Sequence, residues 1–303
     1  MNRLCTFERA MMGSGAKLRI HAVIGSRGAM LVDTAMRGYE SLVKEAVTSV
    51  GRLGRDVTWI VNTHAHHDHM GLNSFAQKLT GARIAAHVHG RAWIRDPLIN
   101  YREFVLQFPD LIKDTPATRE EVFNTLGEGT ELDMGIKGGE HFYLGDTDVE
   151  VVSLPGHVLG EVGLLVREDH TLILGDVLIG LDLPMFHGYV HPVAYRQSLQ
   201  RLRELVASGA VRHVVTSHLP AIEGSQGIIG MVDERLCEVS SIESLILEML
   251  NRGPTSVEDI WLFVSQAKHK RAEFRGLAMV QGHLEDLTAQ MRIVREHGRY
   301  CLA

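Results

Sequence analysis

The chain has 303 residues, of which 45% are hydrophobic and 22% are charged, and its formal net charge is −6 at pH 7. This composition excludes a disordered chain and provides enough apolar material for one large core and a small second domain. The net negative charge argues against nucleic acid as a partner, because phosphate binding needs a local excess of Lys and Arg. No segment reaches the roughly 18 uninterrupted apolar residues of a membrane span, so we expect no membrane partner.

The three cysteines, Cys5, Cys237 and Cys301, are far apart and form no CxxC pair. This spacing argues against a disulfide framework and against a cysteine-rich zinc site. The start of the chain lacks the basic segment followed by an apolar one that a signal peptide needs. These features predict a reducing, cytoplasmic setting. The chain contains 17 histidines, an unusually large number that indicates metal or acid–base chemistry.

The N-terminal part of the chain alternates strand-like and helix-like segments. Two apolar runs flank Gly25-Ser26-Arg27-Gly28, which predicts a β-hairpin, and Gly13-Ser14-Gly15 before them predicts a turn. The alternation that follows predicts a layered α/β core. The predicted elements are a hairpin over 18–33, a helix over 36–50, a strand over 56–63, a short helix that ends at Gly81, and a strand over 82–90.

Residues 96–130 interrupt this alternation with a mostly helical stretch that looks like an insertion. Its apolar side chains, including Tyr101, Phe104 and Phe108, are spaced so that they can pack on the core, and we favour this interpretation. The alternative is a lid whose inner face contacts substrate.

Strands resume after the insertion, and the chain then ends in helices. A buried strand that stops at Pro220 is predicted to be the last strand of the core. In the helical remainder, Thr255 to Glu258 predict a capping box at the start of a helix. Three helices and two short extended pieces around His297-Gly298 resemble a winged-helix module. The expected domains are residues 1–222, with the insertion at about 96–130, and residues 223–303.

The stretch His64-Ala65-His66-His67-Asp68-His69 places four histidines and an aspartate directly after a predicted buried strand. Neutral imidazole and carboxylate are ligands for first-row metals. His64 and His66 are separated by one residue on extended backbone, so they can converge on one ion. Asp68 and His69 follow where the chain turns into a helix, so they can face a second ion close by. For this stretch considered alone, a solvated histidine-rich loop is the alternative.

Three more potential ligands follow, each at the end of a predicted strand. His157 comes after an apolar strand and a Pro-Gly turn, Asp176 ends the run LILGD, and His218 ends the run VVTSH. Open α/β sheets place their ligand-binding residues at the carboxyl ends of strands. The three positions together with HAHHDH therefore favour a metal centre over a solvated loop.

The order HxHxDH followed by His, Asp and His resembles the metallo-β-lactamase superfamily over about residues 18–221. The resemblance implies a four-layer αββα sandwich of the α/β class. Asp33 matches an acidic position that supports the site from outside the ligand shell, and we interpret His67, at a variable position of the motif, as a non-ligand. The resemblance implies a first metal ion held by His64, His66 and His157, and a second held by Asp68, His69 and His218, with Asp176 bridging the two.

Such a centre implies a hydrolase. Two divalent ions about 3.5 to 4 Å apart lower the pKa of a shared water, so that a bridging hydroxide forms near pH 7 and attacks the substrate. Asp68 and Asp176 are the catalytic candidates, and Asp68 can accept the proton as the hydroxide attacks. Zinc is the first choice for the ions, although a site of histidine and carboxylate without thiolate also suits iron or manganese.

The fold alone does not choose among the activities of this superfamily. The helical insertion and the C-terminal helices resemble its acyl-thioester hydrolases, including the quinolone-signal-pathway type, so we expect a small acyl thioester such as an acyl-CoA as substrate. The first alternative is a lactonase of the acyl-homoserine lactone type, which a carbonyl-polarising Tyr189 or Tyr195 would support. The others are an endoribonuclease-like protein and a non-enzymatic regulator, and the intact ligand set argues against the regulator. A homodimer is the candidate assembly.

Five residues outside the ligand set are candidates for the substrate pocket. Three follow Asp176 in the chain, in a loop that often lines the substrate cleft in related proteins, and two lie in the insertion. A second histidine pair, His87 and His89, repeats the spacing of metal ligands, but we interpret it as structural because the ligand set is already complete. The pocket candidates are His187, Tyr189, His191, Phe104 and Phe108.

The helical tail contains a basic segment, KHKRAEFR. It is the one feature that favours RNA binding by the C-terminal module. Abundant Glu and Asp nearby favour a solvated helix face instead. The basic residues are Lys268, Lys270, Arg271 and Arg275.

Overall fold

The computed structural model describes residues 3–11 and 16–303, so the turn predicted at Gly13-Ser14-Gly15 lies outside the described residues. The first sheet has six strands in sequence order, with antiparallel pairing from β1 to β3 and parallel pairing from β3 to β6. The predicted hairpin is present and turns between Gly25 and Gly28. The strands are β1 (Leu4–Ala10), β2 (Lys17–Gly25), β3 (Gly28–Val32), β4 (Val57–Val61), β5 (Arg83–His87) and β6 (Met134–Ile136).

The second sheet also has six strands, in the order β12-β11-β10-β9-β8-β7. Only β10 and β11 pair in parallel, and the other neighbours are antiparallel. The prediction that the strand before Pro220 is the last of the core was wrong by one short strand, because Ile222 and Glu223 return to pair with β11. The strands are β7 (His141–Tyr143), β8 (Asp148–Ser153), β9 (Val162–Val166), β10 (Thr171–Leu174), β11 (His213–Thr216) and β12 (Ile222–Glu223).

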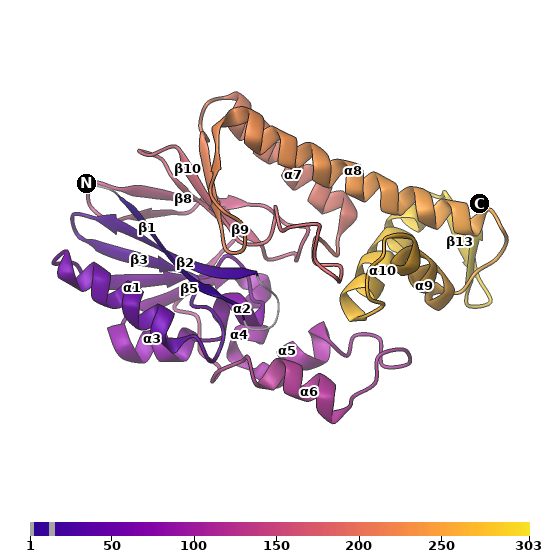
Figure 1. The fold of residues 1–303 in the computed structure, drawn as a ribbon, viewed down its shortest axis with the longest axis horizontal. Coiled ribbons are helices and arrows are strands. Elements are labelled where there is room, and N and C mark those ends of the chain that lie inside the picture. The colour runs from indigo at the N-terminus through magenta and orange to yellow at the C-terminus, as the bar shows by residue number, and fades with distance from the viewer. Residues whose placement is uncertain (1–2, 12–15) are drawn as a thin grey trace.

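The two sheets pack face to face and carry helices on their outer faces, as Figure 1 shows. Along β3, Met30 and Val32 belong to the core between the sheets, while Ala29 and Leu31 pack outward toward α1. This alternation follows from the two-residue period of a strand whose two faces are both buried. The predicted αββα sandwich is therefore confirmed. The helices on the outer faces are α1 (Glu40–Arg52) and α3 (Asn73–Thr80) on the first sheet, and α7 (Pro192–Ala207) and part of α8 (Gly224–Leu250) on the second.

The predicted helical insertion is present and packs on the core. Tyr101, Phe104 and Val105 are buried with the outer core of the first sheet. Phe108 is half-buried and packs against the other outer core, which continues into the C-terminal helices. The insertion therefore touches both halves of the molecule. Its helices, with the short segments before it, are η1 (Val88–Gly90), α4 (Arg91–Arg95), α5 (Pro97–Phe104) and α6 (Pro116–Phe123).

The C-terminal module consists of three helices and a hairpin that turns at His297-Gly298, as predicted. In Figure 1, α8 (orange) runs from the second sheet to the far end of the molecule, where the other elements of the module pack against it. One hydrophobic cluster continues from the second sheet through α7 and α8 into this module. The elements are α8, α9 (Val257–Ala267), α10 (Phe274–Ala289), β13 (Ile293–Glu296) and β14 (Arg299–Leu302).

The capping box predicted from Thr255 to Glu258 was wrong by one position. The helix cap is Ser256, whose hydroxyl oxygen accepts a hydrogen bond from the backbone N–H of Asp259 at 3.1 Å. Thr255 is not available as a cap because its backbone exchanges hydrogen bonds with Tyr300 of β14 at 2.8 and 2.9 Å. Pairing with the terminal hairpin therefore fixes Thr255 in extended form and moves the helix start.

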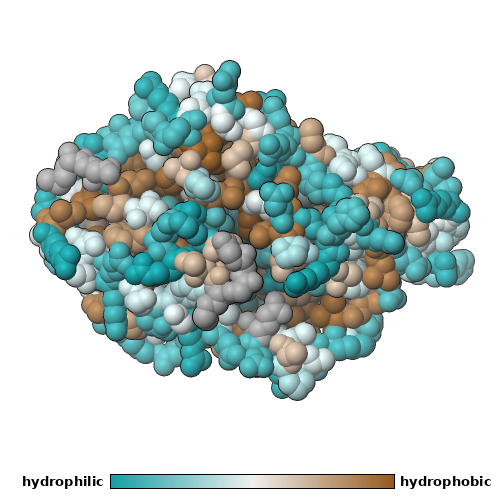
Figure 2. Space-filling view, viewed as in Figure 1, coloured by the Kyte–Doolittle hydropathy of each residue, from teal (hydrophilic) through white to brown (hydrophobic). Residues whose placement is uncertain are grey.

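Figure 2 shows one face of the molecule in space-filling form, where hydrophilic residues separate the larger hydrophobic areas. This surface is consistent with the net charge of −6. In the described part of the chain, helices are all too short or too polar to cross a membrane.

Candidate metal centre

The seven candidate ligands lie together at one edge of the sandwich, where strands of both sheets end. Each sits two to five residues beyond a buried strand or in the helix turn that follows, so the sheets fix the backbone from which its side chain projects. Five of the seven are at most 7% exposed, and the side chain of His218 is 11% exposed. Their positions are His64 and His66 after β4, Asp68 and His69 in the four-residue helix α2 (His67–Met70), His157 after β8, Asp176 after β10, and His218 after β11.

The first group of ligand atoms is rich in nitrogen. His66 Nδ1 lies 3.0 Å from His64 Nε2 and 2.9 Å from His157 Nε2. Oδ2 of Asp176 lies 3.4 Å from His157 Nε2 and closes the group. Burial lowers the pKa of all three histidines, so these rings are neutral and present lone pairs. Three lone pairs directed at one point, with a carboxylate beside them, form a cation site.

The second group is rich in carboxylate. His218 Nε2 lies 3.2 Å from Oδ2 of Asp68 and 3.4 Å from Oδ1 of Asp176. His69 Nε2 also lies 3.4 Å from Oδ1 of Asp176. The two oxygens of Asp176 thus face different groups, Oδ2 the first and Oδ1 the second, which is the arrangement of a bridging carboxylate.

The charges of the second group also fit a cation. Burial alone would lower the pKa of His69 and His218, but the carboxylates of Asp68 and Asp176 raise it. Within the described residues, the buried Nε2 atoms of both rings and Oδ1 of Asp176 have no hydrogen-bond partner. A divalent ion at this point would neutralise the carboxylates and satisfy all three atoms. The residues therefore fit the metal site implied by the sequence.

Asp33 supports the second group from behind. Its Oδ2 accepts a hydrogen bond from His69 Nδ1 at 2.8 Å, and Thr63 and Ser217 donate to the same carboxylate. The backbone of Asp33 has a φ of 60°, an uncommon value for a residue other than glycine. The surrounding hydrogen bonds hold this conformation, and they fix His69 with Nε2 free to face the centre.

Backbone carbonyls hold two other ligands. His157 Nδ1 donates to the carbonyl of Gly188 at 3.3 Å, and His218 Nδ1 donates to that of Lys17, also at 3.3 Å. Gly188 lies in the segment 177–191, which packs on helix α10. The packing is close, because a Cβ atom added to Gly282 of α10 would lie 2.0 Å from the carbonyl oxygen of Val190. The C-terminal module therefore contacts the segment that orients His157.

Glu161 is a buried acid of this site that the sequence pattern did not reveal. It is fully buried, and its Oε1 accepts a hydrogen bond from the backbone N–H of Asp176 at 2.6 Å. Burial, and then the charge of Asp176, raise the pKa of Glu161 well above its usual value. Glu161 fixes the backbone of Asp176. No motif marks it, because it is a single acid in a turn before β9.

A pocket opens beside the first group, against His66 and His157. The Phe104 ring of the insertion lies 4.3 Å from the His66 ring and covers it. Two of the other pocket candidates, His187 and Tyr189, also line this pocket. The residues that line it in the described chain do not include Phe108, which packs on the hydrophobic cluster, or His191, which precedes α7.

The two tyrosines proposed to polarise a carbonyl are occupied elsewhere. The hydroxyl of Tyr189 is hydrogen-bonded to His283 Nε2 at 2.8 Å, and that of Tyr195 donates to the carbonyl of Val177 at 2.6 Å. Burial raises the pKa of both hydroxyls above their usual value, so they stay neutral. This geometry removes the support that Tyr189 and Tyr195 offered for a lactonase.

His87 and His89 lie apart from the ligand groups found among the described residues. His87 Nδ1 accepts a hydrogen bond from the backbone N–H of His89 at 3.2 Å, which caps the turn after β5. This contact agrees with a structural role. His67 likewise does not belong to either group, and its role as a non-ligand stays a prediction.

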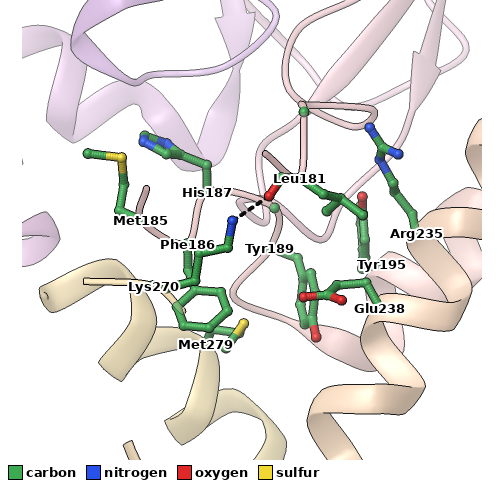
Figure 3. A pocket seen from close by; sticks show the side chains of 12 residues that line it. Leu181, Met185, Phe186, His187, Tyr189, Tyr195, Arg235, Glu238, Lys270 and Met279 are labelled. Carbon is green, nitrogen blue, oxygen red and sulfur yellow. Dashed lines mark hydrogen bonds between the residues drawn. The ribbon is translucent and has the colours of Figure 1, made fainter. Parts of the chain in front are cut away.

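The interpretation of the basic tail segment as a solvated helix face was wrong. Lys270 Nζ donates to the carbonyls of Leu181 and Leu183, and the backbone N–H of Arg271 donates to Pro184. Lys268 pairs with Glu238 at 2.5 Å, and Arg275 lines the pocket. The Lys270 amine and the Arg271 backbone N–H thus satisfy carbonyl oxygens of the segment after Asp176 that no sheet pairs. Figure 3 shows the amine of Lys270 directed at Leu181.

Comparison with known proteins agrees with this fold and site. The sequence pattern of the Metallo-beta-lactamase superfamily matches residues 20–218, and the chain belongs to this superfamily. The acyl-coenzyme A thioesterase MBLAC2 of Gallus gallus is 27% identical over 262 residues, which cover 80% of this chain and 91% of that protein. A hydroxyacylglutathione hydrolase of Methylococcus capsulatus is 28% identical over 189 residues, 62% of this chain. The chain spans 57% of the length of that relative.

Solved structures share the fold at low sequence identity. A metallo-beta-lactamase family protein from Thermus thermophilus superposes with a TM-score of 0.78 at 20% identity, covering 100% of this chain and 99% of that one. A beta-lactamase domain protein from Burkholderia ambifaria gives a TM-score of 0.75 at 16% identity, covering 100% and 94%. At these identities the likeness shows the fold, and the chemistry must be argued from the site.

Proposed function

We propose that this chain is a dinuclear metal-dependent hydrolase of acyl thioesters such as acyl-CoA. The observation that carries the dinuclear part is the position of Asp176, whose two oxygens face two separate ligand groups, each at 3.4 Å from a histidine nitrogen. Six ligand side chains arranged around one bridging carboxylate are more than a single ion requires. The same arrangement argues against a non-enzymatic regulator.

The choice of substrate class rests on the relatives. Acyl-coenzyme A thioesterases named MBLAC2 and several hydroxyacylglutathione hydrolases are similar to this chain in sequence. Both names denote hydrolysis of a thioester. A thioester carbonyl is an electrophile that a strong nucleophile and a polarising cation attack readily.

Divalent ions bound here would act as Lewis acids and lower the pKa of water toward 7. The residues of the chain supply the rest. Asp176 fixes the distance between the two groups, and Asp68, whose pKa the neighbouring His69 and His218 hold well below its usual range despite burial, is an ionised proton acceptor. Phe104 covers His66 and excludes water from that side. We propose zinc, with iron or manganese as alternatives, because the donors are imidazole and carboxylate.

Stripping the metal and restoring it tests this proposal. The purified protein, treated with a chelator and then reloaded with Zn²⁺, Mn²⁺ or Fe²⁺, is assayed with butyryl-CoA, an acyl-homoserine lactone, nitrocefin and a short RNA. We expect metal-dependent release of CoA, with the other three substrates slower by at least about tenfold. Turnover of the lactone or the RNA in preference to butyryl-CoA would overturn the thioesterase proposal and leave the metal hydrolase. A cytoplasmic setting and a homodimer stay predictions.

A further inference from the structure

The pocket beside His66 and His157 is small and mostly apolar. It contains about 350 Å³ of space, and because this figure includes the open mouth, the enclosed part is smaller still. Four apolar side chains line it next to the ligands. These are Phe104 from α5, Phe186 and Val190 from the segment 177–191, and Ala278 from α10.

The polar groups in this wall carry no uncompensated charge. Among the described residues that line the pocket, Arg275 is the only ionised side chain, and it is paired with Glu273 at 2.6 Å and lies 4.3 Å from the Phe274 ring centroid. Burial, with the charge of Arg275 nearby, lowers the pKa of His187 to about 3, so this ring is neutral near pH 7. Because Arg275 is already paired with Glu273, it compensates poorly for the hydration that the phosphates of a thiol carrier would lose here. The pocket therefore suits the acyl side of a thioester, with the carrier outside.

Helix α10 sets the far wall at a fixed distance. It approaches the segment 177–191 closely because two of its residues are glycine, and a Cβ on Gly276 would lie 2.8 Å from the Phe186 ring. Ala278, two residues further along, presents only a methyl group to the pocket. A larger side chain at this position would take space directly from the ligand.

A second cavity adjoins this pocket at Phe186. The two cavities share Phe186, His187 and Tyr189 as a common wall. Figure 3 shows this second cavity, with Met185, Phe186 and Met279 on one side and Tyr195 and Arg235 across from them. Phe186 therefore borders both the pocket that adjoins the metal ligands and the second cavity.

We propose that this pocket holds the acyl group, that it accepts short, uncharged acyl chains, and that Ala278 and Phe186 set the length limit. The proposal rests on the proposed thioesterase function and adds the substrate class. A longer chain must pass the Phe186 ring, and each methylene that is gained or lost in such a pocket changes kcat/KM by about 10- to 200-fold.

Paired variants test the limit in opposite directions. We measure kcat/KM on acetyl-, butyryl-, hexanoyl-, octanoyl- and palmitoyl-CoA with reloaded enzyme. Ala278→Leu is expected to reduce the hexanoyl-to-acetyl ratio by at least about tenfold, and Phe186→Leu is expected to raise the octanoyl-to-butyryl ratio by a similar factor. Ala289→Leu, on the same helix but exposed, is the matched control and should keep the wild-type profile. Damage to the fold would lower kcat/KM for all substrates together, and it could not increase the chain length that the pocket accepts.

A wild-type preference for palmitoyl-CoA, or an unchanged chain-length profile in both variants, would overturn this proposal while leaving the thioesterase intact. If no acyl thioester is hydrolysed, the proposed function has failed, and the pocket is tested by binding alone. Straight-chain carboxylates from acetate to octanoate are then titrated into the metal-loaded protein by calorimetry. We expect affinity to rise up to a short chain and then fall, with the maximum at a shorter chain in Ala278→Leu. An affinity that is independent of chain length would overturn the pocket proposal by itself.

Discussion

The ligand cluster and the pocket beside it lie in contact but are built from different parts of the chain. The ligands project from the ends of strands in two sheets, and buried hydrogen bonds such as that from His69 to Asp33 fix their rings. The pocket wall comes from the insertion, from the segment 177–191 and from α10 in the C-terminal module. Where the two parts meet, Phe104 covers His66, and Gly188 accepts a hydrogen bond from His157.

Because of this difference, we expect the ligand cluster to control the reaction and the pocket wall to control the choice of substrate. Strand ends of a doubly covered sandwich are rigid, so the distance between ligand groups is insensitive to changes elsewhere. The wall depends on contacts between segments far apart in sequence, such as the hydrogen bond between Tyr189 and His283, 94 residues apart. A change in the wall should alter which substrate binds, and a change in the cluster should alter whether any substrate reacts.

The largest expected effect is at the residue that joins both ligand groups. Asp176→Ala removes both carboxylate oxygens, so we expect loss of both metal ions and a fall in kcat/KM of at least about a thousandfold, since such an ion contributes several kcal/mol. Metal content by elemental analysis and butyryl-CoA hydrolysis check this. Asp182→Ala, an exposed aspartate in the adjoining segment, should behave as wild type. Full activity of Asp176→Ala would show that Asp176 does not bridge the ions.

A smaller effect should separate the two ligand groups. Asp33→Asn removes the charge that orients His69, so the second group should lose metal affinity by about 10- to 100-fold while the first is unchanged. Stepwise metal titration by calorimetry resolves the two events. His67→Ala, in the same stretch of sequence, is expected to leave both unaltered. An equal loss of metal affinity in both ligand groups of Asp33→Asn would show that Asp33 does not act on the second group alone.

The packing of the pocket wall is tested through the free energy of unfolding. Gly282→Ala places a Cβ 2.0 Å from the Val190 carbonyl oxygen, so we expect the free energy of unfolding to fall by about 1 to 3 kcal/mol. Gly230→Ala, in α8 with no heavy atom within 4 Å of the added Cβ, should instead raise it by about 0.5 to 1 kcal/mol. Denaturant unfolding of metal-free protein measures both. Stabilisation by both substitutions would show that α10 does not press on this segment.

The smallest effect concerns pH. Burial, with the charge of Arg196 nearby, lowers the pKa of His283 to about 3, against about 6.5 in the unfolded chain. Between these values the unfolded state binds the additional proton, so stability falls as the pH falls below 6.5. His283→Gln should remove about 1 kcal/mol of this loss over the first pH unit below 6.5. Identical pH slopes of unfolding free energy in wild type and variant would show that His283 is charged in the fold.

The features that could be predicted from the sequence are those whose residues lie next to one another in the chain. His64 to His69 follow a β-branched strand, and Asp176 and His218 end apolar runs, so strand ends and ligands were visible together. Strand β1 was not predicted, because four of its seven residues are exposed and its sequence LCTFERA has no apolar alternation. Glu161 was missed because burial of a lone acid depends on neighbours from other strands. The wall residues Ala278 and Arg275 were missed because α10 reaches the pocket only through tertiary packing.

We propose that the two ligand groups joined by Asp176 hold two ions and that both ions are needed for thioester hydrolysis. The most direct test titrates metal-free protein with Zn²⁺ while the rate of butyryl-CoA hydrolysis is followed. We expect the rate to rise and to reach its plateau at about two equivalents of metal per chain. A plateau at one equivalent, or a rate that is independent of added metal, would contradict this proposal.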